Sequence, residues 1–323
     1  MVTRRGFLKG SALAAGTIAL ARMPVSLAGQ NPRSAPPLSQ PNNLLQTMRT
    51  AAASTPIQTT KVTDTIFLLQ GVGGNMVAQI GPDGKLLVDS SMATASHALQ
   101  QVLSKLGANS LKLLINTCWL FDHTDGNAAL HDAGVFIIAQ ENTRVRLSSP
   151  QKMPLLNLSL NSAPNGALPQ LTFTDSDKLY FNNDQIQLVY VPNAQTDSDI
   201  FVHWINANVI HTGDLYHNGS YPLIDAGSGG TINGLIRGVD QVLDITDDRT
   251  RIVPGHGPPG NKASLQKYRD MLAAVANRIE KMKIAGRSLD QVLVAKPTAD
   301  LDAAWGRGPI TPEIFVTGIY STL

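Results

Sequence analysis

The stretch that decides the fold is residues 116–127, which read NTCWLFDHTDGN. It follows KLLI at residues 112–115, a short apolar run typical of a buried strand. It precedes AALHDAG at residues 128–134, which indicates a short helix ended by a glycine. Aspartate and histidine therefore stand where a strand passes into a helix. Because these side chains are common metal ligands, the arrangement predicts a loop that can hold a cation.

Apolar runs and amphipathic stretches alternate on both sides of this loop. Strands are predicted at residues 65–69, 75–80, 85–89, 112–115, 135–139, 171–174, 178–181, 185–191, 200–204, 208–211 and 251–253. Helices are predicted at residues 95–106, 232–243 and 263–282, with a short one at residues 141–147, and a capping-box pattern predicts one more from residue 288. Residues 148–170 are expected to form a long loop. The alternation predicts an α/β layer architecture, but spacing alone does not choose between one sheet and two.

The N-terminal segment has the features of an export signal. Arg4 and Arg5 precede Phe-Leu-Lys, a mild apolar stretch and a small-x-small site at residues 26–28. This pattern predicts a twin-arginine signal peptide at residues 1–28, with an ordinary secretory signal or an N-terminal anchor as alternatives. Residues 29–60 are expected to form a flexible leader with a weak helix near its end, and residues 61–323 the folded domain. We therefore expect a periplasmic or secreted protein.

Composition limits the other partners. The chain has 323 residues, of which 43% are hydrophobic and 15% charged, and its net charge of +2 comes from interleaved basic and acidic residues. A nucleic-acid partner is therefore not expected. No later segment approaches eighteen uninterrupted apolar residues, so we expect no stable membrane insertion once the signal is removed. Cys118 is the single cysteine, which excludes an internal disulfide. The oligomeric state stays open.

The loop at residues 116–127 resembles the signature of the metallo-β-lactamase superfamily, His-x-His-x-Asp-His. The four signature positions are occupied here by Cys118, Leu120, Asp122 and His123, so half of the motif is present and half is replaced. The resemblance covers roughly residues 61–282. It implies an αββα sandwich, in which two sheets lie face to face with helices outside.

The resemblance also implies a ligand set for the second of the two metal sites found in this superfamily. The positions are Asp122 and His123 in the signature, Asp214 in HTGD and His256 in GHG. Two imidazoles and two carboxylates can satisfy a tetrahedral zinc ion. An alternative interpretation is that Asp122 only caps a helix N-terminus. That interpretation does not explain why all four ligand positions match in the expected order.

The first metal site is degenerate by the same comparison. Its three histidine positions hold Cys118, Leu120 and Gln195, and all three losses fall on one site. We therefore expect one zinc ion, at the second site. Cys118 is equally consistent with a buried inert thiol and with a metal contact.

The remaining histidines receive no role. His217 lies three residues after Asp214 and could reach the site, but a surface-loop histidine is the favoured interpretation. The others, on predicted helix or strand positions, are His97, His131, His203 and His211.

Together these features predict an exported one-metal hydrolase acting on a small molecule. Water held on a metal at Asp122, His123 and His256 would attack an amide, lactam, lactone or thioester carbonyl. Asp214 would either bind the ion or act as general base. The alternative is a catalytically inactive binding or structural protein of the same fold. The substrate itself depends on the loops at residues 148–170 and 215–230, whose conformation the sequence does not give.

Overall fold

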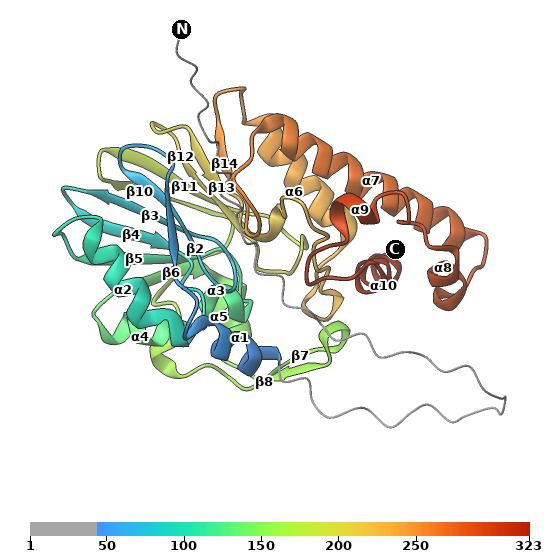
Figure 1. Cartoon of the computed structure of the whole chain (residues 1–323), viewed down its shortest axis with the longest axis horizontal. Helices are drawn as coiled ribbons and strands as arrows, with labels where there is room; N and C mark the ends of the chain where they lie inside the picture. The colour runs from blue at the N-terminus through green and yellow to red at the C-terminus, as the bar shows by residue number, and fades with distance from the viewer. Residues whose placement is uncertain (1–43) are drawn as a thin grey trace, which may run out of the picture. The chain divides into compact units, whose positions relative to one another are not determined.

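The computed structural model describes residues 44–323. Two large β-sheets form the centre of this part of the chain (Figure 1). The first sheet has the strand order β1-β2-β3-β4-β5-β6-β9. Strands β1 to β4 pair antiparallel, and β4, β5, β6 and β9 pair parallel. The bounds are β1 (Gln58–Lys61), β2 (Ile66–Gln70), β3 (Met76–Gly81), β4 (Gly84–Val88), β5 (Leu111–Asn116), β6 (Phe136–Gln140) and β9 (Leu171–Phe173).

The second sheet runs in chain order from β10 to β14. Its strands are β10 (Ser176–Phe181), β11 (Asp184–Tyr190), β12 (Ile200–Trp204), β13 (Val209–His211) and β14 (Arg251–Val253). The first hairpin turns at Asn182 and Asn183, both with positive φ, as a two-residue hairpin loop requires and as asparagine tolerates. Only β13 and β14 pair parallel in this sheet.

The two sheets pack face to face through one apolar layer. In β2, Ile66 and Leu68 face this layer, whereas Leu69 belongs to the cluster on the opposite side of the sheet. This alternation follows from the two-residue period of a strand. The second sheet contributes Trp204 among other fully buried side chains. Burial on both faces explains why these strands read as continuous apolar runs.

Helices cover both outer faces. On the first sheet, α2 (Ser96–Lys105) and α4 (Asn127–Asp132) share an apolar cluster with the strands. The second sheet shares another apolar cluster with three helices, α6 (Ile232–Asp244), α7 (Lys262–Ile284) and α10 (Pro312–Thr322) (Figure 1). The predicted αββα sandwich is therefore confirmed. The other helices are α1 (Leu44–Ala52), α3 (Phe121–Thr124), α5 (Glu141–Leu147), α8 (Leu289–Ala295) and α9 (Asp302–Trp305). Ser288 and Gln291 form the predicted capping box of α8.

Two segments differ from the sequence-based expectation. The expected long loop at residues 148–170 contains a short hairpin, β7 (Gln151–Met153) and β8 (Leu158–Leu160). The weak helix expected near the end of the leader is present as α1, but residues 29–60 also contain strand β1, so the folded unit begins before residue 61. Helix α1 is fastened by Arg49, whose Nη2 and Nε lie 2.5 and 2.9 Å from the two carboxylate oxygens of Asp125. The predicted signal at residues 1–28 and the leader as far as residue 43 lie outside the described residues.

Membrane-spanning helices were sought along the same described range. None of the helices in residues 44–323 combines the length and the apolar character needed to cross a bilayer.

The layer between the sheets predicts a stability effect. Leu86 lies fully buried there, so Leu86→Ala should lower the free energy of unfolding by about 2–5 kcal/mol through lost burial and the cavity left behind. The exposed Val294, with 82% of its surface accessible, offers a matched control, and Val294→Ala should change stability by less than about 0.5 kcal/mol. Urea unfolding measures both, and equal effects would contradict the sandwich core described here.

Candidate metal centre

The predicted metal-site residues lie at one edge of the sandwich, in loops that follow parallel strands. Asp122 and His123 lie in α3, which follows β5. Asp214 lies in the short helix η4 (Gly213–Leu215) after β13, and His256 follows β14. Since the carboxyl ends of parallel strands meet at one edge of a sheet, residues distant in sequence come together there.

The distances show that the four residues converge. Asp214 Oδ1 lies 3.1 Å from His123 Nε2 and 3.4 Å from His256 Nε2. Asp122 Oδ2 lies 3.2 Å from His256 Nε2 and 3.9 Å from His123 Nε2. A tetrahedral zinc ion with ligand distances of about 2.0–2.2 Å separates its ligand atoms by roughly 3.3–3.6 Å. Three of these four distances lie within about 0.2 Å of that range, and the 3.9 Å between Asp122 Oδ2 and His123 Nε2 is longer.

Two glycines allow this close approach. A Cβ on Gly74 would lie 2.3 Å from Cε1 of His123, and a Cβ on Gly255 would lie 2.3 Å from Oδ1 of Asp214. Both distances are far below van der Waals contact. The loops before β3 and after β14 can therefore pass this close to the site only because positions 74 and 255 are glycine.

Asp89, which follows β4, fixes the orientation of His123. Its Oδ2 lies 2.7 Å from His123 Nδ1, and its two oxygens also accept hydrogen bonds from the backbone N–H and the hydroxyl of Thr117. Burial acts to raise the pKa of Asp89, but the charges and hydrogen bonds of His123 and His211 together lower it. Because an ionised carboxylate only accepts, Nδ1 of His123 carries a proton, and Nε2 is the nitrogen whose lone pair a cation could use. Sequence reasoning missed Asp89, for which the only signal was its place at a strand end.

Buried charges perturb the central groups strongly. Burial acts to raise the pKa of Asp214, but the positive charges of His123, His256 and His217 hold it well below its ordinary value. Burial likewise acts to lower the pKa of His123, but neighbouring acidic groups, Asp214 foremost, hold it well above its ordinary value. In the absence of a cation, a proton on His123 Nε2 therefore balances the carboxylates. A metal ion and this proton would compete for the same nitrogen.

Several buried atoms of the cluster lack a hydrogen bond of acceptable geometry, although they lie close together. They are His123 Nε2, Asp214 Oδ1 and His217 Nε2. A buried polar atom without a partner costs free energy, and convergent lone pairs repel each other. A divalent cation would satisfy all three, so the donor set fits the zinc ion that the fold family implies.

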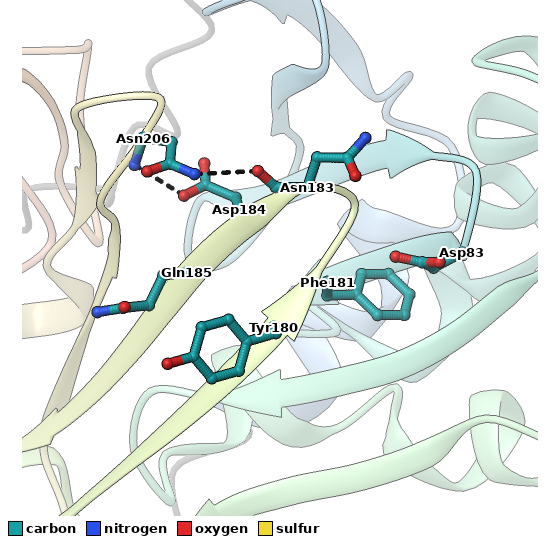
Figure 2. Close-up of a pocket in the computed structure, with 7 residues that line it drawn as sticks. All are labelled: Asp83, Tyr180, Phe181, Asn183, Asp184, Gln185 and Asn206. Atoms are coloured by element: carbon teal, nitrogen blue, oxygen red, sulfur yellow. Dashed lines mark hydrogen bonds between the residues drawn. The ribbon is translucent and has the colours of Figure 1, made fainter.

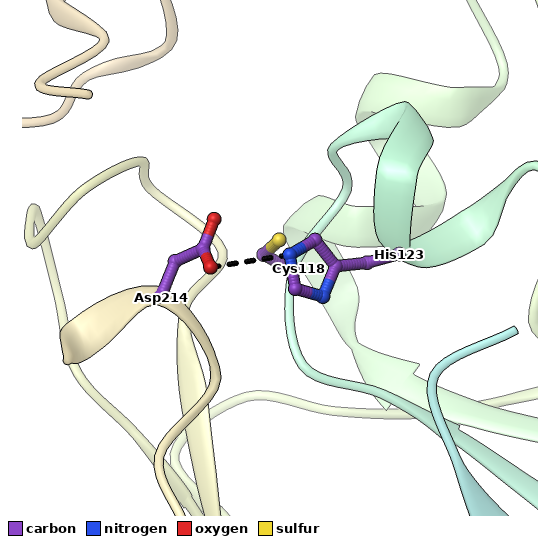
Figure 3. A group of neighbouring side chains, drawn as sticks. All are labelled: Cys118, His123 and Asp214. Atoms are coloured by element: carbon purple, nitrogen blue, oxygen red, sulfur yellow. Dashed lines mark ion pairs between the residues drawn. The ribbon is translucent and has the colours of Figure 1, made fainter. Parts of the chain in front are cut away.

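The three positions of the first site are all buried and none carries an imidazole. Leu120 packs in the apolar cluster with α6 and α7, and Gln195 Oε1 has no hydrogen-bond partner. Cys118 is a free buried thiol whose pKa is raised well above its ordinary value by burial. Its sulfur and the ligand atoms of His123 and Asp214 all lie within 4.8 Å of one another (Figure 3).

His217 is not a surface histidine, and that interpretation of the sequence is wrong. Only 6% of its surface is accessible, its Nε2 lies 3.4 Å from Asp214 Oδ1, and its ring centroid lies 4.7 Å from that of His256. Burial lowers its pKa. The loop folds inward because residue 217 pairs with residue 256 in an isolated β-bridge, which no local sequence pattern signals.

One hollow of the described surface contains none of the metal-site residues. A cavity of about 490 Å³ is lined around the β10–β11 turn by Asp83, Tyr180, Phe181, Asn183, Asp184, Gln185 and Asn206 (Figure 2). None of these residues belongs to the groups that could hold a metal ion.

Comparison with solved structures shows which fold this is. The chain is similar to a metallo-beta-lactamase from Pontibacter korlensis, with a TM-score of 0.57 and 16% identity over 67% of this chain and 99% of that one. The fold is that of the metallo-β-lactamases. The DIM-1 metallo-beta-lactamase gives a TM-score of 0.53 and 18% identity over 68% of this chain and 99% of that one.

The metallo-β-lactamase fold also includes a larger similar structure. The stereoselective inverting sec-alkylsulfatase Pisa1 from Pseudomonas sp. gives a TM-score of 0.64 and 18% identity over 82% of this chain. The match spans 50% of the sulfatase, so this chain corresponds to about half of that protein. No protein-family model and no curated protein matches the sequence.

Asp199 is a further perturbed carboxyl in the loop that carries Gln195. Its Oδ2 accepts hydrogen bonds from the Thr196 backbone N–H at 2.5 Å and the Thr196 hydroxyl at 2.8 Å, whereas its Oδ1 has no partner. Burial, assisted by the charge of Asp214, raises its pKa to about 7.

This raised pKa predicts a pH dependence of stability for the metal-free protein. An unfolded aspartate ionises above about pH 4, whereas Asp199 in the folded chain stays protonated up to about pH 7. The contribution of the protonated Asp199 to the free energy of unfolding is therefore complete below about pH 4 and is lost as the pH rises to about 7. Asp199→Asn should flatten this decline in urea unfolding measured across the range. The exposed Asp132→Asn serves as control, and identical slopes for the two variants would refute the assignment.

Proposed function

We propose that the protein is a metal-dependent hydrolase that holds a single zinc ion among Asp122, His123, Asp214 and His256. The observation that carries the proposal is Nε2 of His123, which makes no hydrogen bond of acceptable geometry although Asp89 fixes its ring and Asp214 Oδ1 lies 3.1 Å away. The short distances from Asp214 Oδ1 to His123 and His256, and from Asp122 Oδ2 to His256, support the same conclusion. The fold supports a metallo-hydrolase more broadly.

The charge balance of the site favours one divalent ion. Asp122 and Asp214 bring two negative charges, which the two charges of a zinc ion would neutralise while both imidazoles stay neutral. At the first-site positions, the leucine has no lone pair to donate and the glutamine offers only an amide oxygen. A second ion would therefore find few ligands.

The chain's own groups suggest how a substrate is handled. When bound, zinc supplies Lewis acidity toward a scissile carbonyl and toward water. Asp122 and His256 are the more accessible members of the cluster, with 13% and 25% of their side chains exposed, so a substrate would approach from their side. A carboxylate of Asp122 or Asp214 that the ion does not hold can accept the proton of the attacking nucleophile.

The substrate class follows from this chemistry only in outline. Amides, lactams, lactones and thioesters present a carbonyl that such a site can polarise. Because one similar structure bears the name of an alkylsulfatase, sulfate esters should be assayed beside them. We further propose a small-molecule substrate rather than a nucleic acid, and action in the periplasm or outside the cell, which rests on the signal-like residues 1–28.

A second function, ligand binding without catalysis, is favoured by one observation. All four donors come from the protein, so a tetrahedral ion held by all of them has no open position, and an open position is what separates catalytic from structural zinc. In that case the ion would stabilise the fold, and the protein would bind a ligand without changing it.

Metal analysis and substitution test the proposal together. The purified protein should contain about one zinc ion per chain, and Asp122→Asn or His256→Ala should remove any hydrolysis of the wild type. The first change replaces a charged oxygen ligand with a weak amide oxygen, and the second removes an imidazole. His97→Ala, on the exposed face of α2, is the matched control and should change neither quantity. Zinc without turnover would favour the binding function, whereas full activity of Asp122→Asn would disprove the assigned site.

Restoration of the first site provides an independent test. The triple variant Cys118→His, Leu120→His and Gln195→His should raise the zinc content from about one to about two ions per chain, because three imidazoles form a zinc site. Elemental analysis of the dialysed protein measures this. An unchanged content in a folded variant would show that the first site has lost more than these ligands.

A further inference from the structure

We propose that His217 is a direct ligand of the metal ion and supplies a third imidazole that the superfamily signature does not contain. The inference rests on the proposed function, because it concerns the same ion. It assigns to the loop after η4 a role in binding the ion.

The backbone holds His217 beside His256. The two residues form a parallel β-bridge, in which the backbone N–H of Asn218 donates to the carbonyl of His256 at 2.9 Å. The N–H of Gly255 donates to the carbonyl of Tyr216 at 3.0 Å. The two imidazole rings lie 4.7 Å apart with planes inclined by 33°. Both side chains are therefore positioned by the main chain rather than by each other.

The side chain of His217 is directed at the same oxygen as the ligand histidines. Three imidazole nitrogens, Nε2 of His123, His217 and His256, lie 3.1, 3.4 and 3.4 Å from Asp214 Oδ1. A carboxylate oxygen offers about two lone-pair directions, so hydrogen bonds to it cannot account for three such contacts. His217 Nε2 is buried and makes no hydrogen bond of acceptable geometry. A cation close to Asp214 would give all three nitrogens a partner.

A third imidazole also resolves the problem of the open position. With three nitrogens on the ion, both carboxylates can leave it and three protein ligands still remain. A tetrahedral ion then has one position open to substrate, and a released carboxylate is free to act as a base. The chain would thus have replaced lost first-site histidines with one from a different loop.

X-ray absorption spectroscopy of the protein loaded with one equivalent of zinc tests the assignment directly. The scattering should fit three imidazoles in the wild type and two in His217→Ala. Loss of a partner outside the ligand shell typically costs 10–100-fold in affinity, so loss of a ligand should lower zinc affinity by more than about 100-fold in chelator competition. His97→Ala should behave as wild type, and circular dichroism should show that each variant is folded.

The outcomes separate the two proposals. A wild type that binds no zinc overturns both the proposed function and the role of His217. A wild type with one zinc and two imidazoles, or a His217→Ala variant within about tenfold of its affinity, overturns only the role of His217. His217→Gln tests whether residue 217 acts only through a hydrogen bond. If this variant binds zinc as tightly as the wild type, direct ligation by His217 is also overturned.

Discussion

The site depends on one buried pair, the Asp89 carboxylate and the His123 imidazole, 2.7 Å apart. A carboxylate removed from water must be compensated by hydrogen bonds or opposite charge, and Asp89 obtains them from His123 and Thr117. This requirement fixes which nitrogen of His123 carries a proton. Consequently the second nitrogen faces Asp214, and the chemistry of the whole cluster follows from a residue that itself lies outside it.

The sandwich explains why such a cluster can form at all. Each sheet ends its parallel strands at the same edge, and each contributes ligands through the loops that leave this edge. Asp122 and His123 come from the first sheet, whereas Asp214, His217 and His256 come from the second. Rigid strands beneath short loops hold the donors at defined distances, with glycine where main chain and ligand would otherwise collide.

Sequence reasoning recovered the architecture and four residues of the cluster because both have local signatures. Buried strands read as apolar runs, and Asp122, His123, Asp214 and His256 stand in short motifs at strand ends. His217 was misjudged because its burial depends on a β-bridge to a residue 39 positions away. The β7–β8 hairpin and strand β1 were missed for a different reason. Short elements with weak periodicity are stabilised by tertiary contacts that the sequence does not display.

The division of ligands between the two sheets has a consequence for the lifetime of the molecule. A bound ion would join layers that otherwise meet mainly through apolar side chains. Any ligand of the folded state alone raises the free energy of unfolding, by about 2.7 kcal/mol when its concentration is one hundred times its dissociation constant. Availability of zinc in the surroundings would then govern resistance to heat and proteases, whether or not a substrate is present.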